Sequence, residues 1–197
     1  MSKTKILCLI GLALFVISYI MFSQGSVFIY SQKPIDFAHW MNLIGGALLI
    51  NFNNVFPKNK MNSVASFLTT LGVFGNVGLC ALDLLMWSYG NDFAGRAELG
   101  NQISNTPSIF YPFQVLGPSF LLTGLSLHAW NFIRRKPFIS LLVIIGAPLI
   151  GISFFVLKNG ILMAICCLLF ALGLGLLLFQ SENKSFDGKS EYTKNDK

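Results

Sequence analysis

The sequence predicts an all-α integral membrane protein, a single bundle of six transmembrane helices joined by short loops. The 197 residues are 54% hydrophobic and only 11% charged, whereas a soluble domain usually carries about 25% charged residues. Six apolar runs, each near the roughly 20 residues that cross a bilayer, follow one another along the chain. The charges gather almost entirely between these runs, so much of the protein surface must face lipid.

The first apolar run, residues 6–22, follows Lys3 and Lys5 and therefore has the charge pattern of a signal peptide. The small residues Ser23 and Gly25 would even suit cleavage. The run is longer than the usual signal core of roughly 7–15 residues. We therefore favour a retained first helix over a cleaved signal.

The other five helices are expected at residues 37–56, 61–89, 113–133, 138–157 and 161–180, which makes residues 1–180 one domain. Asp36 precedes the second helix and can cap its free N–H groups. Pro57 ends that helix, and Pro148 should kink the fifth, because proline lacks a backbone donor. Residues 23–36 and 90–112 are expected to be loops. Residues 181–197 are polar and almost without aliphatic residues, so we expect a disordered cytoplasmic tail.

The basic residues predict the orientation. With the N-terminus inside, eleven of the fourteen lysines and arginines fall on the cytoplasmic side, and only Lys33, Arg96 and Lys158 lie outside. Such a bias is typical of inner loops. We expect both termini in the cytoplasm and a multi-pass protein of the cell membrane, with compact loops that suggest a bacterial inner membrane.

Polar residues recur at helical spacing on the second, third and fourth helices. Such groups are costly in hydrocarbon unless they are satisfied, so these faces should turn toward one another or toward a wet cavity. Asp83 is the only formal charge inside an apolar run. The candidates for this polar core or for binding a ligand are Asn42, Asn76, Asp83, Gln114, His128 and Asn131.

Depth along the helices divides these candidates into two layers. A rise of about 1.5 Å per residue places Asp83 and His39 toward the outer surface and His128 toward the inner one, near Asn53. We therefore expect Asp83 to pair with His39, and His128 with asparagines. If the protein is an enzyme, Asp83, His39 and Asp36 are the candidate catalytic residues, because such groups can take and pass a proton. The alternative is that they only satisfy one another.

Three functions remain open. We favour a non-enzymatic protein: an accessory or assembly subunit, or a binder of lipid or a small ligand. The alternatives are a small transporter or channel that uses helices two to four, and a membrane enzyme with an Asp/His site at the outer leaflet. No sequence motif predicts a cofactor.

The remaining residues limit the partners. The four cysteines lie in apolar runs without metal-ligand spacing, so no metal site is expected. The basic residues form no stripe for nucleic acid. The expected partners are the lipid bilayer and either another protein or a second copy of the chain, since small residues on the last helix allow close helix approach.

Overall fold

The computed structural model describes residues 1–180, and within them the chain is helical with no strand. The helices are α1 (Lys3–Phe22), α2 (Ser26–Ser31), α3 (Phe37–Leu48), η1 (Leu49–Asn54), α4 (Lys60–Ser88), α5 (Phe93–Ser104), α6 (Pro107–Ile109), η2 (Phe110–Leu116), α7 (Gly117–Trp130), α8 (Pro137–Phe155) and α9 (Gly160–Gln180). The prediction of an all-helical protein is therefore confirmed for this part of the chain. The expected disordered tail, residues 181–197, lies outside the described residues.

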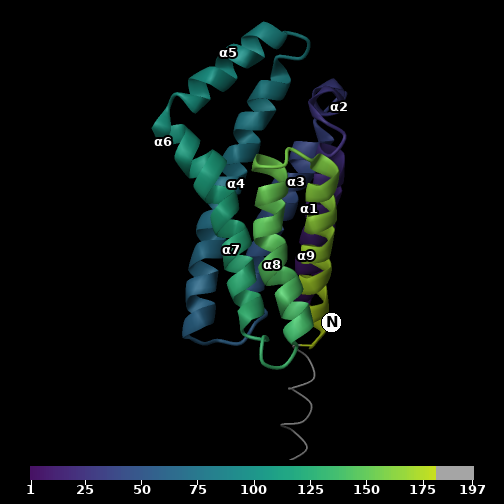
Figure 1. Cartoon of the computed structure of the whole chain (residues 1–197), viewed down its shortest axis with the longest axis vertical. Coiled ribbons are helices and arrows are strands. Elements are labelled where there is room, and N and C mark those ends of the chain that lie inside the picture. Colours follow the sequence, from purple (N-terminus) through teal and green to yellow (C-terminus); the bar gives the residue numbers. More distant parts are fainter. Residues whose placement is uncertain (181–197) are drawn as a thin grey trace, which may run out of the picture.

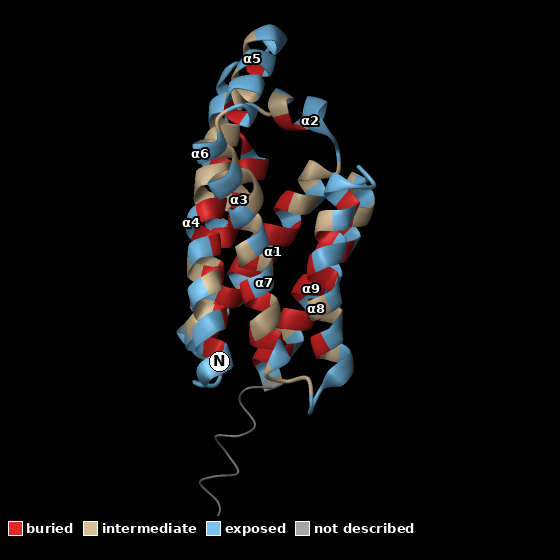
Figure 2. Ribbon diagram, turned by 60° about the vertical axis from the view of Figure 1, so that its left-hand side comes forward, coloured by how far each residue is buried: buried red, intermediate tan, exposed pale blue. Residues whose placement is uncertain are grey.

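The long helices stand side by side along one axis (Figure 1). Each packs against the next in chain order, from α1 through α3, α4, α7 and α8 to α9, and α9 packs back against α1 to close a ring. Buried residues face the inside of this ring, and exposed residues face outward (Figure 2). The outward residues are largely aliphatic or aromatic, among them Ile44, Phe67, Phe74, Leu149 and Leu176. An apolar exterior of this kind suits a lipid environment.

Four helices are long and apolar enough to span a membrane: α1, α4, α8 and residues Gly160–Phe179 of α9. Within residues 1–180 the ring consists of six rods, and the other two of them are interrupted helices: α3–η1, the second rod, and η2–α7, the fourth. In the second, α3 passes into a 3-10 segment, η1, where the side chain of Asn51 donates to the carbonyl of Leu48 (2.8 Å). In the fourth, a π-helical turn, η2, precedes α7, and the N–H of Gly117 bonds the carbonyl of Pro112 five residues back. This rod begins before residue 113, the predicted start.

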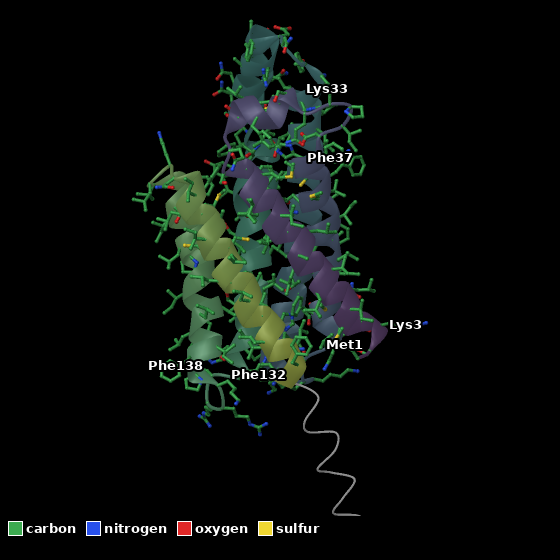
Figure 3. All side chains as sticks on the ribbon, turned by 90° about the vertical axis from the view of Figure 1, so that its right-hand side faces the viewer. Met1, Lys3, Lys33, Phe37, Phe132 and Phe138 are labelled. Atoms are coloured by element: carbon green, nitrogen blue, oxygen red, sulfur yellow. The ribbon has the colours of Figure 1, made fainter. Side chains whose placement is uncertain are left out.

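The bundle has two distinct ends. Met1, Lys3, Phe132 and Phe138 lie at one, which we call the N-terminal end, while Lys33 and Phe37 lie at the other, the α5 end (Figure 3). The described chain also finishes at the N-terminal end, where α9 ends (Figure 1). The basic segment Arg134–Lys136 therefore lies on the same side as the N-terminus.

The segment 90–112 is not the loop that the sequence predicts. It holds α5 and α6, which return from the tip of α4 to the bundle (Figure 1). Asp92 caps α5 by accepting from the N–H of Gly95 (2.9 Å), and Arg96 donates to the carbonyl of Gly90 (3.2 Å). Residues 23–36 likewise contain α2. The cap orders the start of α5, and the contact of Arg96 with the Tyr30 ring joins α5 to α2.

The backbones of α4 and α7 lie in close contact at several glycines. A Cβ added to Gly75 would collide with Gly117, and one added to Gly72 would collide with the backbone of Leu121. The glycines that recur at helical spacing on these helices are therefore packing contacts rather than part of a polar face. Fully buried Phe15, Phe52 and Phe170 fill the core of the bundle.

Candidate functional site

The candidate site begins where α3 begins. Asp36 is completely buried and caps the helix: its Oδ1 accepts from the N–H of His39 (3.0 Å). Its Oδ2 lies 2.5 Å from Nδ1 of the same histidine. One carboxylate therefore holds both the backbone and the imidazole ring of His39. The spacing of three residues at a helix start makes this double contact possible.

Asp83 completes the cluster from α4. Its Oδ2 lies 3.4 Å from Nε2 of His39, so the imidazole lies between two carboxylates. The predicted pairing of Asp83 with His39 is confirmed in the structure. His39 can donate to both carboxylates only as the imidazolium ion. Asp83 keeps partial exposure, with 19% of its side chain accessible, whereas Asp36 has none.

Aromatic side chains surround the Asp36–His39–Asp83 cluster. The ring of Phe22 lies 4.9 Å from that of His39 and contacts Tyr19. Tyr30 comes from α2, and burial together with the charge of Asp83 raises the pKa of its phenol. The guanidinium of Arg96 lies 4.0 Å from the centroid of the Tyr30 ring, within the range of a cation–π interaction. This contact joins α5 to α2 at the α5 end of the bundle.

An amide cluster lies next along the bundle. Asn76 Nδ2 donates to Asn42 Oδ1 (2.9 Å), which also accepts from the thiol of Cys80 (3.3 Å), while Asn42 Nδ2 donates to Ser18 (3.2 Å). Gly46 leaves room for the Asn76 side chain, because a Cβ there would collide with it. The cluster satisfies polar groups from α1, α3 and α4 internally.

A cavity of about 1230 Å³ extends from these residues along the bundle. His39, Asn42, Asn76, Asp83 and Gln114 line its most polar part. Residues of α7 and α8 line much of the rest, and they include the hydroxyl side chains of Ser119, Thr123 and Ser126 beside apolar ones. Several lining residues on these two helices are exposed: Ser119, Thr123 and Trp130 on α7, and Pro148, Phe154 and Phe155 on α8. The cavity therefore opens sideways, along the seam between α7 and α8, which stand next to each other in Figure 1. It also opens at the α5 end, where the lining residues Gly25, Ser26 and Lys158 are exposed.

The remaining candidates form a separate cluster near the N-terminal end. His128 is fully buried, with Nδ1 at 2.5 Å from Asn62 Oδ1 and Nε2 at 3.1 Å from Asn53 Oδ1. Asn131 accepts from Asn59 (2.8 Å) and donates to the carbonyl of His128 (3.3 Å). The expected association of His128 with asparagines is confirmed. These groups contact one another and do not line the cavity, so a packing role fits them best.

Sequence reasoning missed the contributions of α1, α2 and α8. Tyr19 and Phe22 lie in an apolar run that shows no functional pattern, and Ser18 is one small residue within it. Asn62 was missed as the partner of His128, although its position one helical turn from Ser66 and two from Thr69 places it on a buried face. No group of three His, Cys, Asp or Glu residues within 1–180 is arranged to hold a metal ion.

The chain matches no protein-family model, no curated protein and no solved structure. The geometry of the cavity and the chemistry of its lining are therefore what support a function.

Proposed function

We propose that the protein crosses the bilayer six times and binds one amphiphilic, lipid-like molecule in its cavity. The ligand's polar head lies against the Asp36–His39–Asp83 cluster, and its hydrocarbon lies along the seam between α7 and α8. In this arrangement the interrupted rods α3–η1 and η2–α7 also span the membrane. The segregation of basic residues to the N-terminal end supports a cytoplasmic N-terminus.

The observation that carries this proposal is the shape and lining of the cavity. Its volume of about 1230 Å³ exceeds the roughly 300–1,000 Å³ typical of sites for drug-sized molecules. The titratable and amide groups gather at one end, while Leu122, Leu127 and Ile144 line the remainder together with the hydroxyl side chains of α7. A sideways opening toward lipid lets a membrane-dissolved molecule enter without crossing water.

The packing around the amide cluster supports a binder over a channel. Asn42 and Asn76 use their polar atoms on each other, on Ser18 and on Cys80. Leu49 and Leu121 of the neighbouring core are almost fully buried, with 0% and 1% exposure. A closely packed apolar core of this kind offers a hydrophilic solute no continuous polar path.

Filling the cavity tests the proposal. A Cβ at Gly151, which lines the cavity, would meet no atom within 4 Å, so Gly151→Leu adds volume there without a packing clash. Gly100 on α5 has equally open surroundings and does not line the cavity, so Gly100→Leu is the matched control. The probe is hexadecanol carrying a photoreactive diazirine, and the readout is the mass of labelled protein and the labelled peptides.

We expect labelling on α7 and α8 that unlabelled hexadecanol displaces. Gly151→Leu should lower the labelling several-fold, and Gly100→Leu should leave it unchanged. Labelling spread evenly over the lipid-facing helices, and unaffected by Gly151→Leu, would overturn the proposal.

A further inference from the structure

We propose that the head group bound in this cavity is a primary ammonium, held by the carboxylate of Asp83. This inference rests on the proposed function and specifies the class of amphiphile: a long-chain amine or another lipid whose head presents a protonated primary amine. The argument uses the charge of the Asp36–His39–Asp83 cluster, the free acceptor capacity of Asp83 and the aromatic lining.

With both carboxylates ionised, the cluster carries more negative than positive charge. Two carboxylates face one imidazole, so even a fully protonated His39 neutralises only one of them. Within residues 1–180, no lysine or arginine forms an ion pair with Asp36 or Asp83. The guanidinium of Arg96 instead contacts the rings of Tyr30 and Phe93 and the carbonyl of Gly90. An uncompensated carboxylate at membrane depth is costly unless a cation reaches it.

Asp83 is the carboxylate that can accept a ligand. Asp36 is fully buried and uses both oxygens on His39. Asp83 lines the cavity, and its contact with His39 at 3.4 Å involves only Oδ2. A carboxylate can accept several hydrogen bonds, so Oδ1 remains available to a donor in the cavity.

The surroundings favour a cation of this kind. Tyr19, Phe22 and Tyr30 line the cavity beside His39, and aromatic faces attract cationic nitrogen. A primary ammonium carries N–H donors for Asp83, whereas a quaternary ammonium carries none. An anionic head would meet like charge at Asp83. Its one lysine partner among the lining residues would be Lys158, which is exposed at the turn between α8 and α9.

The experiment compares different head groups on the same hydrocarbon chain. Purified full-length protein is labelled at pH 7 with the photoreactive hexadecanol, and four competitors are titrated against it: hexadecylamine, hexadecyltrimethylammonium, hexadecanol and hexadecanoate. The same series is run on Asp83→Asn and on Asp92→Asn. Asp92 is an exposed acid that caps α5 and does not line the cavity, so its substitution controls for a general loss of negative charge.

We expect hexadecylamine to compete at least about tenfold more strongly than hexadecanol, the scale of one charge-assisted hydrogen bond. Hexadecyltrimethylammonium should fall between the two, and hexadecanoate should be the weakest. Asp83→Asn should remove the preference for the amine while hexadecanol still binds, which also shows that the variant is folded. Asp92→Asn should keep the preference.

Other outcomes overturn the inference in distinguishable ways. Equal competition by amine and alcohol would refute the ammonium head and leave amphiphile binding intact, and an amine preference that survives Asp83→Asn would exclude Asp83 as its partner. Strongest competition by hexadecanoate would refute the ammonium and indicate an anionic head group that pairs with Lys158. Failure of every competitor would remove the proposed function itself.

Discussion

At the scale of single residues, Asp36 has two roles that substitution can separate. Its carboxylate caps α3 and holds the ring of His39. Asparagine is about as good a helix cap as aspartate, whereas alanine is not. We expect Asp36→Asn to lose the charged contact but keep the cap, and Asp36→Ala to lose both.

The two variants should therefore both unfold more easily than the wild type, with Asp36→Ala lower in free energy of unfolding by about 1 kcal/mol, the value of one cap. Unfolding of the purified protein by titration with sodium dodecyl sulfate, followed by circular dichroism, measures this difference. Equal destabilisation by the two substitutions would show that the cap adds nothing beyond the contact with the ring.

Pairing within the site could be predicted at this scale because depth along a helix follows from residue count. Asp83 and His39 meet across the antiparallel neighbours α4 and α3, and His128 meets Asn53 at the common depth that a constant rise per residue predicts. Tyr19 and Phe22 could not be predicted as lining residues. An aromatic in an apolar run looks the same whether it faces lipid, core or cavity.

At the scale of helices, the contact between α4 and α7 depends on Gly75 and Gly117 lying against each other. We expect Gly75→Ala to lower stability by about 1–3 kcal/mol, because the added methyl group overpacks the contact. Gly100→Ala is the matched control: its Cβ meets nothing within 4 Å, and alanine favours a helix over glycine by roughly 0.5–1 kcal/mol. The same detergent titration should therefore give opposite signs for the two substitutions. A stabilising Gly75→Ala would mean that helix propensity outweighs this contact.

The apolar runs predicted the long helices well, since each must bury or expose apolar surface along its length. They failed at α5, whose sequence holds Gly95, Gly100 and Glu98 and whose mean polarity reads as a loop. Its order depends on Asp92 at the cap and on Arg96 against Tyr30, a residue far away in the sequence. Contacts of this kind leave no local periodicity. The π-helical start of the fourth rod was missed for a different reason: proline is typical of loops, and Pro112 lies within this segment.

At the scale of the whole molecule, the proposed six-span topology predicts that α5 and the Arg134–Lys136 segment lie on opposite faces of the membrane. All four native cysteines are buried, so they give little background in labelling with a thiol reagent. Arg135 is exposed, and a Cβ at Gly100 would meet no atom within 4 Å. Gly100→Cys on α5 and Arg135→Cys at the N-terminal end therefore each add one accessible thiol. With the N-terminus in the cytoplasm, a membrane-impermeant maleimide should label Gly100→Cys on intact cells and Arg135→Cys only after permeabilisation.

The reverse result would invert the orientation while keeping the fold. If both were labelled from outside, residues 100 and 135 would lie on the same side of the membrane. The chain would then not cross the membrane once between them, which would exclude η2–α7 as a span. The cavity's seam between α7 and α8 would then not face lipid along its length, so this labelling experiment also decides whether an amphiphile can enter from the bilayer.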